Sequence, residues 1–366
     1  MTTQSDAPGM IAYDGQLGHM ATLKDGRIVS AYTPRLPDAA QRLDADNPEI
    51  PVYLRYSHDN GLTWSEPYSA FSYPPGKGVV GSCFPLVAPD GTLHVLALRF
   101  YKLGGDFAAE SKSHSTVVHS ASANGGKTWT EIHNVDYGKS YTGALNSAIA
   151  LNSGRLLLVL SSPSDRQGGR NVCISTYSDD GGVRWHPGSQ EIIVPDGEFR
   201  GHPGALEPVV VELLDGRIWM IIRTQIGCFY QSYSTDNGAT WSEPAQTRFQ
   251  APNAPAGICR LADKRIVLCW NDLSQYPADI GGNQRQFLHI AISDDNGKTF
   301  SRSKEIARRR REDREDTNVA YPFLCQAPDG HILVLYYRVG CAEGVTWWHP
   351  IIEVLRIHPN WIAAGS

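Results

Sequence analysis

Four residues in the second half of the chain have the chemical types needed to handle an anionic group. Glu207 and Arg223 stand 16 residues apart in GHPGALEPVVVELLDGRIWMIIRT, Arg285 lies in RQFLHIAISDDNGKTF, and Tyr321 lies in VAYPFLCQAPDGHILVLYY. An arginine guanidinium binds a carboxylate through two parallel hydrogen bonds. A carboxylate can take the proton of a nearby hydroxyl and so activate it as a nucleophile. These residue types are therefore candidates for binding and reacting with an acidic ligand.

Each of the four residues also has a structural explanation, which the sequence leaves open. Glu207 precedes a proline and could be a strand-edge residue with a satisfied side chain. Arg223 lies at the end of an apolar strand-like run and could form an ion pair between structural units. Tyr321 could serve in packing, and Arg285 follows a polar GGNQ stretch in which it could be simply exposed.

The elements that must position these residues are indicated by a repeated phrase, Ser-x-Asp-x-Gly-x-Thr-Trp. Five near-copies begin, at intervals of 65, 56, 56 and 59 residues, at Ser57, Ser122, Ser178, Ser234 and Ser293. Asp or Asn with Gly favours a tight turn, and the final aromatic residue can pack inward. A regular period of this length indicates an array of similar structural units.

A second periodic element lies between these phrases. Six apolar runs, each entered through a short turn, begin at Lys24, Pro89, Asn152, Leu214, Ala262 and Pro328. Such runs predict β-hairpins, and four short strands in about 60 residues are the content of one propeller blade. The chain is therefore predicted to be all-β, a six-bladed β-propeller forming a single domain over residues 1–366. The phrases should lie on the outside, and the last blade, which lacks one, should be completed by the start of the chain.

The composition is that of a globular protein without an obvious affinity for polyanions. The net charge is −5 and 41% of the residues are hydrophobic, so we expect no nucleic-acid partner. No apolar run reaches the length of a membrane span. The seven cysteines show no metal-ligand spacing, and no signal peptide is visible in MTTQSDAPGM, so we expect a cytoplasmic protein with reduced thiols. We expect neither a metal nor a cofactor, because no motif for either is present.

The most basic run is RRRREDRED, from Arg308 to Asp316. Acidic residues follow the four arginines closely, so we interpret it as a solvated loop and not as a binding patch.

The repeated phrases resemble the Asp-box, or BNR, repeats of the sialidase superfamily, over nearly the whole chain. This resemblance implies a six-bladed propeller that cleaves a terminal acidic sugar, with Tyr as the nucleophile. It assigns Tyr321 as the nucleophile and Glu207 as its base. Arg223 and Arg285 match arginines that bind the substrate carboxylate.

The chain departs from the family pattern in its first blade. The Arg-Ile-Pro motif is missing, and the corresponding stretch is YDGQLGHMATLKDG. We expect Arg35 to compensate partly and Asp38 to be the acid/base, with Asp44 and Asp46 as alternatives. His19 and His202 could replace an arginine as donors to a carboxylate, or act as bases.

Three functions are consistent with these observations. The first is a retaining exo-glycosidase acting on sialic acid or a related acidic sugar of a glycan. The second is a lyase for a uronate-containing glycan, in which arginines neutralise the carboxylate. The third is a propeller that binds glycans or proteins without catalysis. The sequence does not indicate the oligomeric state.

Overall fold

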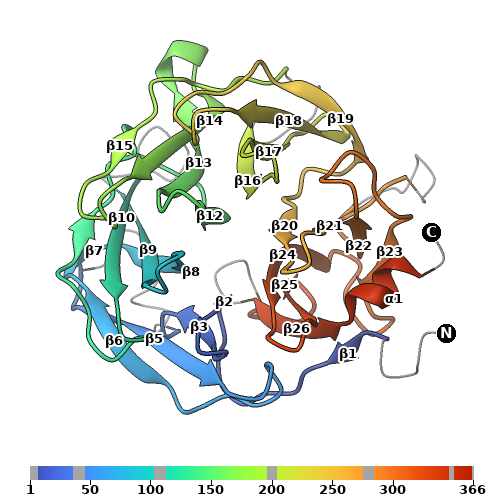
Figure 1. Cartoon of the computed structure of the whole chain (residues 1–366), viewed down its shortest axis with the longest axis horizontal. Coiled ribbons are helices and arrows are strands. Elements are labelled where there is room, and N and C mark those ends of the chain that lie inside the picture. The colour runs from blue at the N-terminus through green and yellow to red at the C-terminus, as the bar shows by residue number, and fades with distance from the viewer. Residues whose placement is uncertain are drawn as a thin grey trace.

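The computed structural model describes residues 7–35, 46–102, 113–195, 204–274, 284–345 and 350–364. Within these ranges, the strands form six four-stranded antiparallel sheets arranged as blades around a central axis (Figure 1). The predicted six-bladed β-propeller is confirmed. One further two-stranded ladder joins β4 (Asp46–Asn47) to β7 (Gly76–Lys77).

The first three blades follow one another along the chain, with the innermost strand given first. Blade 1 consists of β2 (His19–Thr22), β3 (Ile28–Tyr32), β5 (Ile50–Ser57) and β6 (Tyr68–Tyr73). Blade 2 consists of β8 (Val79–Val87), β9 (Leu93–Lys102), β10 (Ser113–Ser122) and β11 (His133–Asn134). Blade 3 consists of β12 (Ser147–Ala150), β13 (Leu156–Ser164), β14 (Arg170–Ser178) and β15 (His186–Pro187), with a 3₁₀ turn at Asp165–Gln167.

The last three blades complete the ring. Blade 4 consists of β16 (Leu206–Glu212), β17 (Ile218–Arg223), β18 (Cys228–Ser234) and β19 (Ala245–Gln250). Blade 5 consists of β20 (Gly257–Arg260), β21 (Ile266–Trp270), β22 (Phe287–Ser293) and β23 (Lys304–Arg308). Blade 6 consists of β24 (Asn318–Gln326), β25 (Ile332–Val339), β26 (Ile351–Ile357) and β1 (Gly9–Met10), and the short helix α1 (Pro359–Ala363) follows it.

The ring closes because β1 pairs with β26, so the first strand of the chain is the outermost strand of the last blade. This confirms the predicted completion of the last blade. Within the described residues, no helix is long and apolar enough to cross a membrane.

The hairpin turns follow from local sequence. In the turn between β2 and β3, Gly26 has φ +86° and its N–H donates to the carbonyl of Leu23, while the Asp25 carboxylate accepts from the N–H of Arg27. Glycine adopts this left-handed conformation without steric penalty. In blade 5 a lysine, Lys264, takes the same place with φ +76°.

The repeated phrases form turns between the third and fourth strands of blades 1 to 5, away from the axis, as predicted. In blade 4 the hydroxyl of Ser234 donates to Asp236 at 2.8 Å and accepts from the N–H of Gly238 at 2.8 Å. Asp236 also accepts from the N–H and the hydroxyl of Thr240. The phrase is therefore a self-contained hydrogen-bonded turn whose role is structural.

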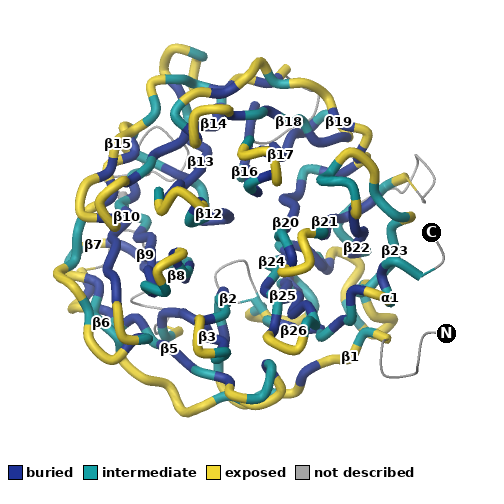
Figure 2. Tube along the Cα trace, viewed as in Figure 1, coloured by how far each residue is buried: buried dark blue, intermediate teal, exposed yellow. Residues whose placement is uncertain are grey.

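The hydrophobic core lies between the blades. The described residues form six buried apolar clusters, one at each interface between neighbouring blades. Figure 2 shows buried residues along the strands and exposed residues at the connecting turns. The inner strands of all six blades are thereby held around the axis, where their residues can meet.

Candidate active site

Glu207 and Tyr321 lie on the innermost strands of blades 4 and 6, each at a bulge in its strand. The register shifts between Leu206 and Val209 in β16 and between Ala320 and Phe323 in β24. Both residues adopt left-handed backbone conformations, with φ +35° for Glu207 and +59° for Tyr321. Bulges redirect side chains and are frequent next to active sites, and strained backbone conformations of this kind cluster at functional positions.

A third bulge occupies the same place in blade 2. The register shifts between Val80 and Cys83, so that Gly81 corresponds to Glu207 and Tyr321. The residues that pair with the three bulged strands also correspond, and they are Arg99, Arg223 and Tyr337. Blades 2, 4 and 6 therefore each have a bulge at the same place in the innermost strand. In blades 4 and 6 the bulge carries a side chain with acid/base chemistry, Glu207 or Tyr321.

Three side chains from two blades form a direct hydrogen-bonded unit. The hydroxyl of Tyr321 donates to Oε1 of Glu207 at 2.8 Å. Nη1 of Arg223 forms an ion pair with Oε2 of Glu207 and donates to the Tyr321 hydroxyl at 3.2 Å. The side chains of Arg223 and Glu207 are only 7% and 10% exposed, so their ion pair is largely shielded from bulk water.

Burial and charge tune the protonation of this unit. Burial, together with the Glu207 carboxylate, raises the pKa of Tyr321 to about 12, against the opposing effect of Arg223 and Arg285. Burial alone would lower the pKa of Arg223, but the adjacent Glu207 carboxylate and Tyr321 hold it above its usual value. The phenol is therefore neutral at physiological pH, and the arginine is charged.

Asn253 connects this unit to a second arginine. Its side-chain oxygen accepts a hydrogen bond from Nε of Arg223 at 2.7 Å, and its backbone carbonyl accepts one from Nη2 of Arg285. The guanidinium of Arg285 lies 6.0 Å from the centre of the Tyr321 ring. Burial and the neighbouring Arg223 lower the pKa of Arg285. Two guanidinium groups are thus brought together beside the phenol.

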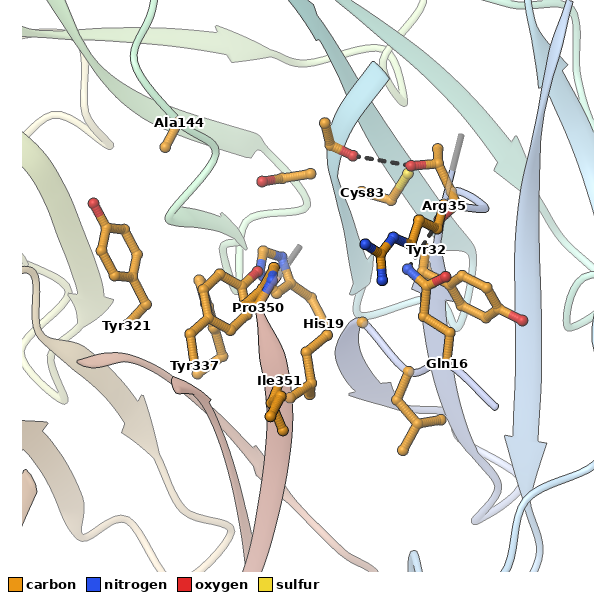
Figure 3. A pocket seen from close by; sticks show the side chains of 18 of the residues that line it. Gln16, His19, Tyr32, Arg35, Cys83, Ala144, Tyr321, Tyr337, Pro350 and Ile351 are labelled. Carbon is orange, nitrogen blue, oxygen red and sulfur yellow. Dashed lines mark hydrogen bonds between the residues drawn. The ribbon is translucent and has the colours of Figure 1, made fainter. Parts of the chain in front are cut away.

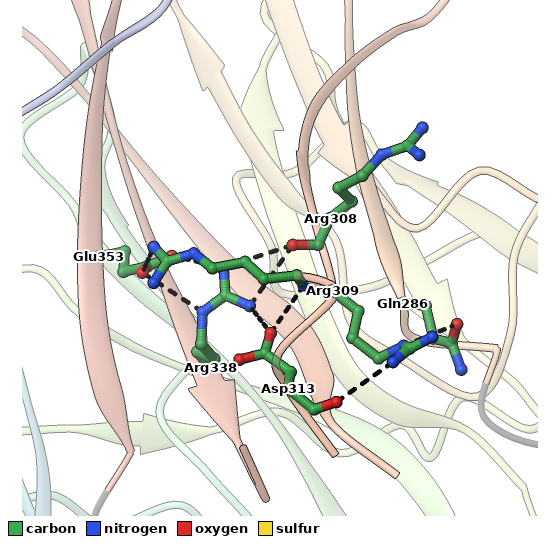
Figure 4. Close-up of polar contacts among 7 residues, drawn as sticks. Gln286, Arg308, Arg309, Asp313, Arg338 and Glu353 are labelled. Carbon is green, nitrogen blue, oxygen red and sulfur yellow. Dashed lines mark hydrogen bonds and ion pairs between the residues drawn. The ribbon is translucent and has the colours of Figure 1, made fainter. Parts of the chain in front are cut away.

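The basic run Arg308 to Asp316 contacts Arg338 of β25, Glu353 of β26 and Gln286, the neighbour of Arg285 in the chain (Figure 4). Arg338, whose side chain is 3% exposed, pairs with Asp313 at 2.5 Å and with Glu353 at 3.0 Å. The N–H of Arg309 donates to the carbonyl of Gln286. The interpretation of this run as a merely solvated loop is wrong in part, because Asp313 is buried by a partner from β25 that is distant in sequence.

A cavity of about 1050 Å³ opens beside the hydrogen-bonded unit. Its wall includes Glu207, Tyr321, His19, Tyr337 and Arg35. In Figure 3, Tyr321 and Arg35 lie on opposite sides of this cavity. Arg35 is exposed. Among the described residues, no group of three or more His, Cys, Asp or Glu side chains could hold a metal ion.

His19 lies on β2 in the wall of this cavity and is buried between aromatic rings. Its ring is 3.7 Å from that of Phe323 and 5.1 Å from that of Phe84, measured between centres. Burial lowers the pKa of His19 to about 3, although the backbone of Cys83 partly opposes the shift. His19 is therefore neutral at physiological pH and supplies no positive charge to the wall of the cavity.

The structure brings Glu207, Arg223, Arg285 and Tyr321 together, and it places Arg35 and His19 in the wall of the adjacent cavity. Asp38 and His202 lie outside the described residues, as does Asp44. Asp46 lies on β4 and is exposed.

Sequence reasoning missed Asn253 and Tyr337. The Tyr337 ring stacks on that of Tyr321, with centres 5.8 Å apart. Its position opposite a bulge follows from the strand register, of which Pro322, directly after Tyr321, was a local sign. Asn253 lies between prolines in the segment APNAPAG, and these prolines were the one available sign of a fixed loop.

Comparison with known proteins agrees with this architecture. Residues 39–334 match the family described as the BNR repeat-like domain. No curated protein matches the chain.

Several solved structures are similar in fold. A protein of unknown function from Dyadobacter fermentans has a TM-score of 0.66 and 21% identity, covering 96% of this chain and 98% of its own. The Hadza microbial sialidase Hz136 has a TM-score of 0.68 and 18% identity, covering 95% of this chain and 66% of its own. The intramolecular trans-sialidase from Ruminococcus gnavus has a TM-score of 0.64 and 16% identity, covering 99% of this chain and 96% of its own.

At these sequence identities, the solved structures show similarity of fold alone. Membership of a family rests on the family match, which covers most of the sequence. The chain therefore belongs to the BNR repeat-like domain family, as a sialidase-like six-bladed β-propeller.

Proposed function

We propose that the protein is a retaining exo-glycosidase that removes a terminal acidic sugar from a glycan. The observation that carries this proposal is the hydrogen bond between the Tyr321 hydroxyl and Glu207, with Arg223 bound to both. A nucleophile within hydrogen-bond reach of its base, with the base oriented by a third group, is the arrangement expected for covalent catalysis. Tyr is the nucleophile that sialidases use in place of a carboxylate.

The reaction follows from the contacts of the unit. Glu207 takes the phenolic proton as the Tyr321 oxygen attacks the anomeric carbon, and the bond to the leaving group breaks. Arg223 stabilises the negative charge that develops on the phenolic oxygen, because it already donates a hydrogen bond to that atom. Water then attacks the sugar on Tyr321 and gives its proton to the carboxylate that had protonated the leaving group, while Glu207 returns its proton to the phenol. Two displacements at one carbon retain its configuration.

A neutral phenol suits a substrate that carries its own carboxylate, because an anionic nucleophile would be repelled by it. The pKa of about 12 for Tyr321 keeps the hydroxyl protonated until Glu207 accepts the proton. Arg223 and Arg285 are the groups that we propose to hold the substrate carboxylate. The acid that protonates the leaving group is proposed to be Asp38, from the segment that follows Arg35.

The proposal accounts for the missing arginine of the first blade. His19 is neutral and enclosed by Phe84 and Phe323, so we expect it to supply no positive charge in place of an arginine. We expect weaker binding of the sugar acid than in a site with three arginines, with Arg35 contributing at the far wall of the cavity.

The proposal is tested with a panel of chromogenic sialosides and uronides. An active glycoside should give a product that keeps its anomeric configuration, as followed by NMR. A fluorinated sugar with a reactive leaving group should be trapped on the peptide that contains Tyr321. Tyr321→Phe should lose nearly all turnover, whereas Tyr177→Phe on the outer part of blade 3 should keep it. An unsaturated product absorbing in the ultraviolet would indicate a lyase, and binding without turnover would indicate a glycan-binding propeller.

A further inference from the structure

The cavity beside Tyr321 continues well beyond the groups that would react with the sugar. Tyr321 lies on β24, the innermost strand of blade 6, whereas Met10 lies on β1, its outermost strand, and both residues line the same cavity. Three interstrand spacings separate these strands, which amounts to about 14 Å. The cavity therefore runs outward along blade 6 as a groove, and it is longer than a single sugar ring requires.

The outer part of this groove is apolar. Met10 is 51% exposed and Ile351 is 42% exposed, and both line the groove together with Ile352 and Tyr13. The hydroxyl of Tyr13 donates to the carbonyl of Ile352 at 2.5 Å, so it is engaged by the backbone of β26. Large apolar side chains that are exposed together along one groove indicate a ligand surface.

The charged side chains near the groove do not make its outer part polar. The Glu353 carboxylate lines the cavity, but Arg338 and Arg310 are paired with it. Arg35 lies in the wall on the side opposite Tyr321 (Figure 3). The wall of the groove between the side chains of Tyr13 and Ile351 thus presents hydrocarbon and few hydrogen-bonding groups to a bound molecule.

We propose that this groove, lined by Met10, Tyr13, Ile351 and Ile352, binds an elongated apolar aglycone, an alkyl chain or an aromatic ring system, of the glycoside. The proposal rests on the proposed function, because Tyr321 marks the bond that is broken and the groove begins there. A further sugar would leave its hydroxyl groups without partners against this wall, which is unfavourable. An alkyl or aryl group would instead remove apolar surface from water on both sides. The substrate class is therefore an acidic sugar linked to an apolar group.

The first test measures binding without catalysis. The neutral apolar dye N-phenylnaphthylamine should bind the wild-type protein with increased fluorescence. The double variant Met10→Gln/Ile351→Asn should weaken binding at least about tenfold. The matched control is Leu214→Asn, which removes a leucine that is 57% exposed in a turn of blade 4. Equal dye binding in the groove variant and the wild type would overturn the proposal, as would an equal loss in the Leu214 control.

The second test separates the groove from the catalytic proposal. Methyl, n-octyl and phenyl α-glycosides of N-acetylneuraminate are compared as competitors for the dye, in the wild type and in Tyr321→Phe. The octyl or phenyl glycoside should displace the dye in both proteins at concentrations at least about tenfold below those needed for the methyl glycoside. If the octyl glycoside displaces the dye at a lower concentration than the phenyl glycoside, the natural aglycone is an alkyl chain. The reverse order identifies an aromatic ring system. Equal displacement by all three glycosides would overturn the aglycone assignment.

Measurement of glycoside cleavage then tests the proposed hydrolase function separately from the groove. If the glycosides are cleaved, kcat/KM should be higher for the preferred apolar glycoside than for the methyl glycoside, and this ratio should fall toward one in Met10→Gln/Ile351→Asn. A ratio of one in the wild type would contradict the groove assignment. Dye displacement without cleavage of any glycoside would contradict the hydrolase and leave the apolar groove supported.

Discussion

The hydroxyl of Tyr321 and the carboxylate of Glu207 are 2.8 Å apart, although 114 residues separate them in the chain. They meet because the innermost strands of blades 4 and 6 each carry a bulge at the corresponding position. Arg223, which pairs with Leu206 at the start of the blade 4 bulge, contacts both groups. The reactive unit is thus produced by the ring closure and by two local departures from regular strand geometry.

Glu207→Gln should lower kcat by a hundredfold to about ten-thousandfold, because the phenol loses the base that accepts its proton. The double variant Glu207→Gln/Tyr321→Phe should be no slower than Tyr321→Phe alone within about threefold, since base and nucleophile act as one unit. Single-turnover rates on an active chromogenic glycoside provide the measurement. Multiplicative losses in the double variant would mean that the two groups act independently.

Arg223→Met should destabilise the fold by about 3 kcal/mol, because it leaves the buried Glu207 carboxylate without its counter-ion. Adding Glu207→Gln should restore much of the loss, since the uncompensated charge is then removed. Urea denaturation measures both effects. The matched control is Arg217→Met, which breaks the exposed Arg217–Asp215 pair of the same blade and should change stability by less than about 1 kcal/mol. Equal losses at Arg223 and Arg217 would contradict the buried-charge explanation.

Asp236→Ala in the blade 4 box should lower stability by about 2 kcal/mol, because the turn loses acceptors for Ser234 and for Thr240. Asp236→Asn should be nearly neutral. The blade 2 box already has Asn124, whose side-chain oxygen accepts from Ser122 and from the N–H of Thr128. Thermal denaturation of the two variants tests this, and a loss for Asn as large as for Ala would show that the charge is essential.

Asp313→Ala should lower kcat/KM at least about tenfold, because Arg338 then loses its ion pair with the loop that precedes Tyr321 and keeps only its hydrogen bonds to the Arg308 carbonyl there. The same loop contacts Gln286, next to Arg285. The control is Asp316→Ala in the same loop, where Asp316 forms an exposed ion pair with Arg314. Steady-state kinetics on folded protein, with the melting temperature measured in parallel, checks the expectation. Unchanged kinetics in Asp313→Ala would mean that β24 alone positions Tyr321.

Stability should fall as the pH drops from about 6.5 to about 4, because of a buried histidine pair. Nδ1 of His94 is 2.9 Å from Nε2 of His119. Burial lowers the pKa of His94 to about 4 and that of His119 to about 3, with His133, Asp90 and Asp180 as charged or titratable neighbours. In this pH window the unfolded histidines, with pKa near 6.5, bind protons that the folded protein excludes, so the unfolded state gains stability.

The decrease in melting temperature over this pH range should be smaller in His94→Gln/His119→Gln than in the wild type. His58→Gln, at an exposed histidine in the first box, should leave the decrease in melting temperature over this pH range unchanged. An equal slope in the double variant would assign the acid sensitivity to other groups.

The sequence by itself determined the propeller, its six blades and the closure of the ring. Hairpin turns and boxes such as the one at Ser234 depend on residues within a few positions of each other, so their period is visible without a structure. The resemblance to sialidases also drew attention to Glu207, Arg223, Arg285 and Tyr321, since each stands at a recognisable place in its blade.

Only the tertiary structure decided what these residues do to one another. The bulges that turn Glu207 and Tyr321 toward each other are shifts of register between strands. Pro208 and Pro322, which directly follow these residues, are local signs of the bulges, but they do not indicate which side chains meet. Asn253 joins the two arginines from a loop, and Arg338 buries Asp313 in a run that the sequence presents as solvated. His19 loses its charge because two phenylalanines from other blades enclose it. Burial and pairing depend on residues brought together from distant parts of the chain, and this is why the chemistry of the site required the fold.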